Sequence, residues 1–295
     1  MAEPHYRVFA LRYGSNRRRR RAENIIFRGP GDDHDAPMPM DFFVWAIVGP
    51  DGPGPNGPTA YRPGRGATVL VDTGSGPRTM TARGHDHLRS PGAALATLGV
   101  HAGDVTDVIT THMHWDHAGN VQDFPGARLH VQRAEMAHAT GPAMCSGFLR
   151  RPYDAEQLAE WLAELYRGRV TFHQGDEEIA PGISVHHVGG HTPGMQVVRV
   201  STARGQLVLA SDAMHYYENL AAENPFPVLV NAIDYIEALR TVTRLADGPD
   251  HIIPGHDPRV LTRFPAAHPD VADVAALHLE PVQVAGDRVT TQVTS

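Results

Sequence analysis

The stretch THMHWDHAG, residues 111–119, gathers three histidines and one aspartate within six residues. They are His112, His114, Asp116 and His117. An apolar run that predicts a strand, 105–110, ends directly at this cluster. In a helix, residues two apart would point about 200° apart, whereas on an extended turn they share one face. Because imidazole and carboxylate suit zinc, manganese, iron or cobalt, the stretch predicts a metal site at a strand end.

Three further candidate ligands stand elsewhere in the chain, each just past another apolar run. They are His191 in GGHTPG, Asp212 in SDA and His256 in PGHD. Glycines beside a ligand allow backbone conformations that bring its side chain close to an ion. Sheet enzymes commonly build their sites at strand ends, and together these seven nitrogen and oxygen ligands suffice for two metal ions. The sequence therefore predicts a site for two divalent cations.

Composition excludes several other classes of site. The chain has 295 residues and a net charge of −7, which argues against nucleic acid or an anionic membrane as the main partner. It contains no lysine, so Schiff-base and lysine general-base chemistry are excluded. Its one cysteine, Cys145, rules out an internal disulfide and a cysteine zinc cluster.

The beginning of the chain carries an apolar run too brief for a secretion signal, followed by five arginines at 17–21. No run of about 18 apolar residues suggests a membrane span, so we expect a cytoplasmic protein with no membrane partner. The arginine run could bind an anion or a partner chain, although a solvated turn or sheet edge is the simpler interpretation.

Short apolar strands alternate with helical patterns along most of the chain, which predicts a mixed α/β protein. The segment 49–66 is too rich in glycine and proline for helix or strand, and a long hairpin loop is expected there. We expect strands at 42–48, 67–71, 105–110, 128–132, 183–188, 196–200, 207–210 and 252–253, and helices at 155–166 and 233–245. In the first helix, helical spacing predicts a core face of Leu158, Trp161, Leu162 and Leu165.

Five separated motifs make the chain resemble the metallo-β-lactamase superfamily over about residues 42–260. They are VDTG (71–74), THMHWDHAG, GGHTPG, SDA and PGHD, in this order. The resemblance implies an αββα sandwich, with two mixed β-sheets face to face and helices outside. It also implies a binuclear metal site along one sheet edge, and we expect one such domain to cover residues 1–295.

The resemblance assigns a role to each candidate ligand. His112, His114 and His191 would hold the first metal, Asp116, His117 and His256 the second, and Asp212 would bridge the two. Asp72, in the first motif, would orient the site without binding metal. Zinc is the expected metal, with manganese, iron or cobalt as alternatives.

Two such cations predict hydrolytic chemistry. A zinc-bound water can have its pKa lowered to about 7, and a second metal would also polarise the electrophile. We therefore expect attack by a metal-bridging hydroxide, with Asp116 orienting it and then carrying a proton to the leaving group. The chain has neither a G-x-S-x-G serine elbow nor a phosphate-binding loop of the G-x-x-x-x-G-K type, which leaves the nucleophile to the metals.

Within the superfamily, the stretch SDAMHYYENL resembles the N-acyl-homoserine lactonase-like branch, which implies a small-molecule lactone substrate and a homodimer. At the branch's tyrosine this chain has His215, so either His215 or the adjacent Tyr216 or Tyr217 is expected to contact the substrate carbonyl. The stretch 135–151, with Phe148, is a candidate wall of an apolar substrate pocket.

The same motifs are compatible with a second activity. Hydrolysis of acyl thioesters is the main alternative, because glyoxalase II-type enzymes share the same ligand set. A β-lactam substrate is disfavoured because Asp212 stands where those enzymes typically use cysteine. A di-iron redox site would need a glutamate in place of a ligand histidine and a flavin domain, neither of which is seen. A non-enzymatic scaffold with a relic site would have lost ligands, whereas all seven are present.

Overall fold

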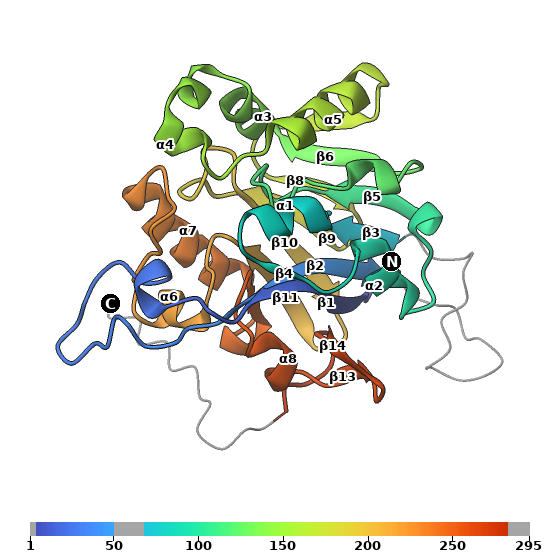
Figure 1. Ribbon diagram of the computed structural model, residues 1–295. Coiled ribbons are helices and arrows are strands. Elements are labelled where there is room, and N and C mark those ends of the chain that lie inside the picture. The colour runs from blue at the N-terminus through green and yellow to red at the C-terminus, as the bar shows by residue number, and fades with distance from the viewer. Residues whose placement is uncertain (1–3, 50–67, 283–295) are drawn as a thin grey trace.

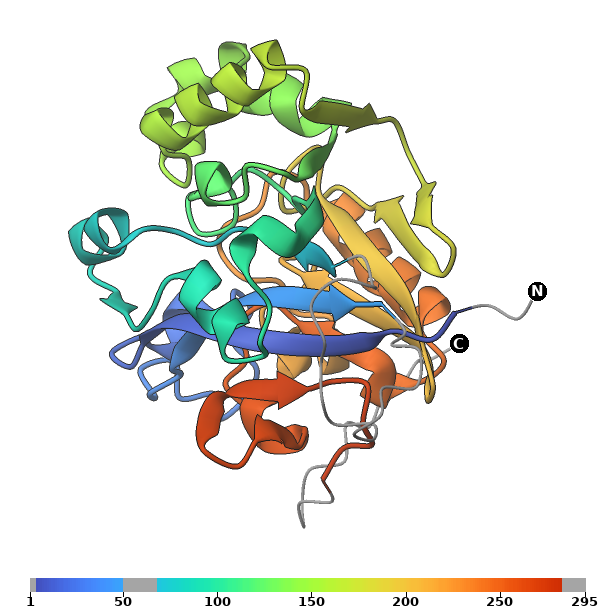
Figure 2. The same ribbon diagram turned by 90° about the vertical axis from the view of Figure 1, so that its right-hand side faces the viewer.

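The computed structural model describes residues 4–49 and 68–282 as two β-sheets packed face to face with helices outside (Figures 1 and 2). Both sheets are mixed, since each contains parallel and antiparallel pairs. The αββα prediction is therefore confirmed. The hairpin loop expected at 49–66 lies, except for its first residue, outside the described residues.

The larger sheet has nine strands, antiparallel on one side of β3 and parallel on the other. Its order is β13 (Ala266–His268), β14 (Val271–Ala276), β1 (Arg7–Asn16), β2 (Met40–Val48), β3 (Thr68–Val71), β5 (Val105–Ile109), β6 (Arg128–Gln132) and β7 (Val170–His173), with β4 (Asp86–His87) pairing with β1.

The smaller sheet has five strands and is antiparallel except where β11 pairs with β12. Its order is β12 (Ile252–Pro254), β11 (Gly205–Ser211), β10 (Gln196–Thr202), β9 (Ile183–His187) and β8 (Glu177–Ala180).

Strand β2 shows how the sequence builds the layers. Every residue of β2 is buried, which a strand in the middle layer of a sandwich requires. Because successive side chains point to opposite faces, Phe43, Trp45 and Ile47 join the core between the sheets. Phe42 and Val44 join the core on the outer face of the larger sheet.

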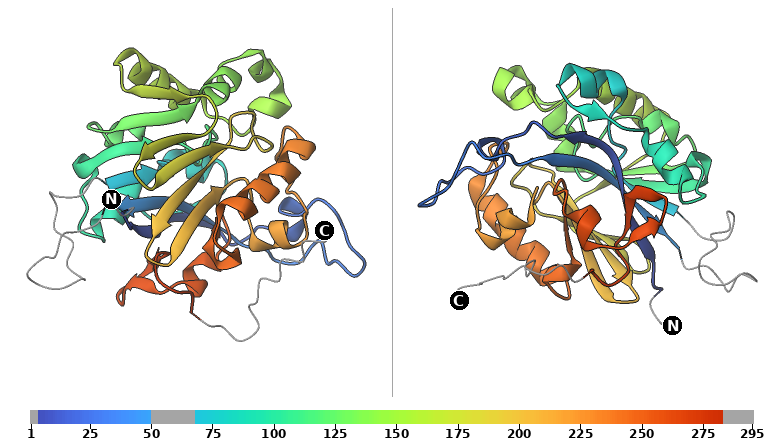
Figure 3. Two further views of the ribbon diagram at one scale, coloured as in Figure 1. Left: turned by 180° about the vertical axis from the view of Figure 1, so that it is seen from behind. Right: turned by 60° about the horizontal axis from the view of Figure 1, so that its bottom comes forward.

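Eight α-helices are assigned within the described residues. They are α1 (Pro77–Ala82), α2 (Pro91–Ala96), α3 (Arg133–Ala139), α4 (Gly147–Arg150), α5 (Ala155–Tyr166), α6 (Tyr217–Ala221), α7 (Ala232–Leu245) and α8 (Val260–Arg263). Helix α7 packs on β11 at the outer face of the smaller sheet (Figure 3), and α2 packs on β1. No helix within 4–49 or 68–282 combines the length and apolarity needed to cross a bilayer.

Helix α5 has the predicted bounds, and Leu162 is the one residue of its predicted core face that is exposed, whereas Leu158 and Leu165 are partly buried. Trp161 is buried and its indole N–H donates to the carbonyl of Ala118 at 2.9 Å. Leu162, however, is 48% exposed. The buried position on the next turn is Glu164, whose carboxylate is compensated by Arg167 and Arg169.

The strands bring the polar motifs together at one edge of the sandwich. Asp72 follows β3 and His112 lies just past β5, and these two strands run parallel. Asp212 follows β11 and His256 lies just past β12, which also run parallel. The backbone N–H of Gln196 in β10 donates to Thr111 at 3.0 Å, which joins the two sheets there. Carboxyl ends of strands from both sheets therefore converge, the usual place for a site in sheet enzymes.

Candidate metal centre

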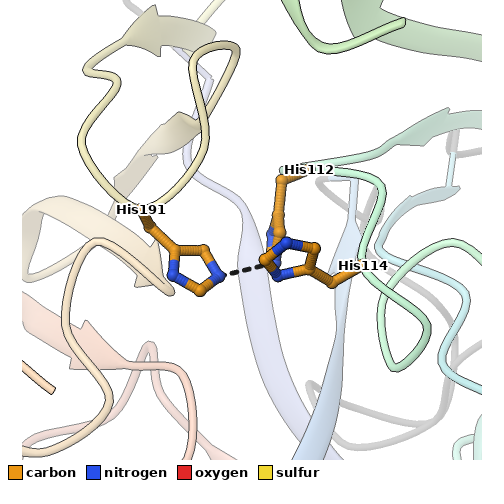
Figure 4. Close-up of side chains that lie close together, drawn as sticks. All are labelled: His112, His114 and His191. Carbon is orange, nitrogen blue, oxygen red and sulfur yellow. Dashed lines mark hydrogen bonds between the residues drawn. The ribbon is translucent and has the colours of Figure 1, made fainter. Parts of the chain in front are cut away.

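Three of the predicted ligands form one group at this edge. His112 and His114 come from the loop after β5, and His191 faces them from the loop between β9 and β10 (Figure 4). The Nε2 atoms of His112 and His191 lie 3.1 Å apart. One nitrogen from each of the three rings lies within 4.8 Å of the others. These are the residues expected to hold the first metal.

Asp116, His117 and His256 form a second group by the same distance criterion. Nε2 of His117 lies 3.5 Å from Oδ2 of Asp116, and Nε2 of His256 lies 3.7 Å from the same oxygen. Ligand atoms around a tetrahedral ion with bonds of about 2.0–2.1 Å lie roughly 3.3 Å apart, so this spacing suits a metal.

The carboxylate of Asp212 lies between the two groups. Its Oδ1 is 3.0 Å from Nε2 of His256 and 3.4 Å from Nε2 of His117. Its Oδ2 is 3.3 Å from Nε2 of His191 and 3.8 Å from Nε2 of His112. One oxygen of Asp212 thus faces each group, which is the arrangement a bridging ligand needs.

Hydrogen bonds behind the rings leave the Nε2 atoms turned toward the cluster. Nδ1 of His191 lies 2.6 Å from the carbonyl of Val228, and Nδ1 of His256 lies 2.8 Å from the carbonyl of Asp41. A ring that donates through Nδ1 has its Nε2 lone pair free for a metal. Nε2 of His117 and Oδ1 of Asp212 are buried and form no hydrogen bond within the described part of the chain. All seven side chains are buried, and this donor set fits divalent cations.

The protonation tendencies of the histidines agree with a metal-binding role. Burial, helped by repulsion from neighbouring histidines, holds the pKa of His112 and His114 well below the ordinary value. These rings are therefore neutral at pH 7, which is the ligand form. The pKa of His117 shifts in the opposite direction. Burial lowers it, but the carboxylates of Asp212, Asp116 and Asp72 raise it well above the ordinary value. A cation bound there would replace this proton as the partner of the carboxylates.

Asp72 holds the loop of the second group. Its carboxylate accepts hydrogen bonds from the backbone N–H of Thr111 at 2.7 Å and from the Thr111 hydroxyl at 2.8 Å. It also lies 2.8 Å from Nδ1 of His117. Asp72 itself has a φ of 60°, a left-handed conformation that aspartate tolerates better than most residues. Its position behind His117 agrees with the orienting role expected for it.

Glu135, on α3, braces both ligand loops and was not singled out from the sequence. Its carboxylate accepts hydrogen bonds from the N–H of Met113 at 2.9 Å, the N–H of Gly194 at 3.1 Å and the hydroxyl of Thr192 at 2.6 Å. Glu135 is fully buried, unlike most helical glutamates. A single sequence offers no signal that separates it from a surface glutamate.

A cavity of about 570 Å³ opens over the cluster. Six of the predicted site residues line it, namely His114, Asp116, His191, Asp212, His215 and His256. Nε2 of His215 lies 2.8 Å from Oδ2 of Asp212, and its ring stacks on Phe226 with centroids 3.4 Å apart. Burial lowers the pKa of His215 to about 3, so the ring is neutral. Its Nδ1 forms no hydrogen bond to any described residue.

The structure does not bring Tyr216 and Tyr217 into this cavity. The Tyr216 hydroxyl donates to the carbonyl of Pro39 at 3.1 Å. The Tyr217 ring is buried beneath the guanidinium groups of Arg259 and Arg263. Tyr216 is the N-cap of α6 and Tyr217 is its first residue, and both rings lie in packed core regions.

Phe148 lines a cavity beside the cluster, separate from the larger one. It is 70% exposed and lines a narrow adjoining cavity of about 30 Å³, together with Leu149 and Val228. Met136, from the same stretch, is buried in the core on the outer face of the larger sheet. Only part of 135–151 therefore faces a cavity.

The fold and the His/Asp cluster together define a metal-binding protein of the αββα type. The chain belongs to the metallo-beta-lactamase superfamily, whose family model matches residues 52–256. The cluster residues from 112 to 256 all lie within the matched range.

Curated relatives carry a common name. The N-acyl homoserine lactonase AiiB of Agrobacterium fabrum is 31% identical over 210 residues, which are 65% of this chain and 75% of that protein. An N-acyl homoserine lactonase of a Bacillus species is 31% identical over 157 residues, 52% of this chain and 54% of that protein. The chain thus spans about half the length of the Bacillus relatives that it matches.

Solved structures share the fold. A quorum-quenching N-acyl homoserine lactone lactonase aligns with a TM-score of 0.66 at 21% identity, over 88% of this chain and 95% of that one. AidC, a dizinc quorum-quenching lactonase in complex with a product, aligns with a TM-score of 0.61 at 17% identity, over 88% and 90% of the two chains. At these identities the likeness shows the architecture.

Proposed function

We propose that this protein is a hydrolase that holds two divalent metal ions, most readily zinc, and opens the ester ring of lactones. The observation that carries this proposal is the Asp212 carboxylate, with one oxygen toward His117 and His256 and the other toward His112 and His191. A buried carboxylate shared between two histidine groups is costly unless cations compensate it.

Different residues would bind the metals and transfer protons. His112, His114 and His191 would hold one ion, Asp116, His117 and His256 would hold the other, and Asp212 would be shared between them. Bound there, divalent cations would activate water at neutral pH and polarise the ester carbonyl. Asp116 would orient the attacking water and move its proton toward the leaving alkoxide, and its position at the cavity wall supports this role.

His215 supplies the donor toward the substrate oxygen. Its ring is held on two sides, by stacking on Phe226 and by the contact of Nε2 with Asp212, while the ring borders the cavity. A neutral imidazole donates from one nitrogen, and because Nδ1 is buried, that donor is the Nε2–H, which faces Asp212. Once cations compensate the Asp212 carboxylate, this N–H can hydrogen-bond the carbonyl oxygen or the developing alkoxide. Tyr216 and Tyr217 are left out of this role because their hydroxyls do not reach the cavity.

The substrate class draws its support from the relatives. Proteins about 30% identical over half of this chain or more are named N-acyl homoserine lactonases. The narrow cavity beside the cluster, with Phe148 and Leu149 on its wall, offers apolar surface for an acyl chain. Homodimer formation stays a prediction.

A hydrolysis screen on zinc-loaded enzyme tests the proposal. Opening a lactone releases one proton per turnover, so a pH indicator can follow N-acyl-homoserine lactones and simple γ-lactones side by side. We expect turnover of lactones that is abolished in His191→Ala. Inert lactones together with rapid cleavage of an acyl thioester would replace the lactonase proposal with the thioesterase alternative.

A further inference from the structure

Three arginines from separate parts of the chain line the cavity above the metal centre. Arg19 follows β1, Arg83 follows α1 and Arg151 follows α4. Within 4–49 and 68–282, none of the three forms an ion pair with a carboxylate. Two neighbours in the same arginine run behave differently, because Arg17 pairs with Asp41 and Arg21 pairs with Glu218.

Arg83 is held in place by groups that do not neutralise it. Its guanidinium donates to the carbonyl of Arg151 at 3.1 Å and to the carbonyl of Tyr153 at 3.0 Å. It also lies over the indole of Trp115, with its Cζ 4.9 Å from the ring centroid. These contacts orient the group but leave its full positive charge on the cavity wall, where less water screens it.

Arg19 and Arg151 add charge at the same cavity. The Arg19 guanidinium donates to Asn24 and to the carbonyl of Glu23, both neutral acceptors. The Glu23 carboxylate also borders the cavity, and it accepts a hydrogen bond from the backbone N–H of Arg20 at 2.8 Å. The Arg151 side chain is exposed and can follow a ligand.

The cavity lining also includes three carboxylates, those of Glu23, Asp116 and Asp212. Asp116 and Asp212 belong to the proposed metal site, so two bound divalent cations would more than compensate them and leave the arginines as excess positive charge that an anion can neutralise. Guanidinium groups bind planar carboxylates through paired hydrogen bonds, and these arginines have donors that no described carboxylate occupies.

We infer that the cavity takes lactones that carry a carboxylate, which Arg83 and Arg151 bind with help from Arg19. This inference rests on the proposed lactonase function and narrows its substrate class. Hydrolysis would add one water across the ring C–O bond and release one proton, so the product would be a hydroxy-dicarboxylate. A preceding reaction would have to form a lactone ring on a carboxylic acid, or a following reaction would have to consume the hydroxy-dicarboxylate product.

A matched pair of lactones tests the inference on zinc-loaded enzyme. 5-Oxotetrahydrofuran-2-carboxylate and its carboxamide share one ring and differ mainly in charge. We expect kcat/KM to be at least about tenfold higher for the carboxylate, mainly through a lower KM that rises with ionic strength. Arg83→Gln and Arg151→Gln should each lower kcat/KM for the carboxylate much more than for the carboxamide and so remove most of this preference.

Arg240→Gln is the control, because Arg240 is an exposed residue of α7 that pairs with Glu237 and its loss changes the net charge equally. If Arg83→Gln fails to fold after losing its two carbonyl contacts, Arg151→Gln decides the matter, since its side chain is exposed. Equal turnover of both lactones by the wild type would overturn the inference and leave the lactonase proposal standing.

Binding by calorimetry separates the two proposals further. If neither lactone is hydrolysed, the lactonase proposal fails for these rings, and 2-hydroxyglutarate binding still tests the arginine site. Binding that weakens about tenfold or more in Arg151→Gln, but not in Arg240→Gln, supports an anion site. Binding that is absent, or equal in all variants, overturns it.

Discussion

Oδ2 of Asp72 lies 2.8 Å from Nδ1 of His117, on the side of the ring opposite the nitrogen that faces Asp212. The imidazole therefore connects two carboxylates, one that orients it and one at the metal centre. A carboxylate behind a ligand histidine fixes the tautomer of the ring and raises its basicity. We therefore expect Asp72 to influence a metal bound at His117 through this ring.

Asp72→Asn should weaken metal binding without unfolding the protein. Asparagine tolerates the left-handed φ of 60° at this position, but its amide is a poorer acceptor for the His117 N–H. We expect a loss of about 10–100-fold in metal affinity or activity, measured by chelator competition and by kcat/KM. Asp270→Asn, at a side chain that is 90% exposed, is the control. Wild-type affinity in Asp72→Asn would show that the contact does not tune the site.

Glu135→Gln should reduce stability more than an ordinary surface substitution. The carboxylate accepts from Met113, Thr192 and Gly194, and a glutamine would turn a donor toward one of these donors. An unsatisfied buried group costs about 1–3 kcal/mol in the free energy of unfolding. Denaturant unfolding should show this loss, while Glu237→Gln on the exposed face of α7 should stay within about 0.5 kcal/mol. Equal stability of the two variants would contradict the bracing role.

His215→Ala should lower kcat and leave the metal content unchanged. Removing one donor to a developing oxyanion typically costs about 10²–10³ in kcat. Tyr216→Phe and Tyr217→Phe should behave like the wild type, because neither hydroxyl borders the cavity. Loss of metal from His215→Ala would instead make His215 a ligand, as its proximity to Asp212 and His256 also allows. A slow Tyr216→Phe enzyme would return the donor role to the tyrosine.

Gly255→Ala should disturb Asp212. A Cβ at Gly255 would meet Oδ1 of Asp212 at 2.8 Å and the backbone of Ser211 at 2.8 Å, closer than real contacts allow. We expect lower metal content and a lower Tm, measured by elemental analysis and thermal unfolding. Gly103→Ala is the matched control, since nothing lies within 4 Å of its Cβ position. Normal metal content in Gly255→Ala would mean that Asp212 adapts.

The strands next to the motifs were predictable because they are short apolar runs bounded by glycine or polar residues. The pattern gave the bounds of β6 and α5 correctly and placed β9 and β12 within a residue. Strand β1, in contrast, shows in the sequence only as a brief apolar run before the arginines. It interleaves polar and apolar residues, and its burial depends on β14 and β2, which are distant in sequence.

The seven candidate ligands were identified from motifs at strand ends, and their division between two metals followed from the family resemblance. The structure brings all seven together. The cavity wall could not be predicted in this way. Arg19, Arg83 and Arg151 are more than sixty residues apart and meet only after the sheets have formed. Tyr216 and Tyr217 are close to Asp212 in sequence but do not reach the cavity. Their position in the sequence does not reveal the direction in which side chains point at the beginning of α6.

The bridging position of Asp212 is tested most directly by counting metal ions in purified protein. Elemental analysis of enzyme expressed with added zinc should give close to two equivalents per chain. In Asp212→Ala the count and the lactonase activity should fall together, because the two histidine groups lose their shared ligand. A wild-type enzyme that holds one equivalent or none and still opens lactones at its full rate would contradict the binuclear account.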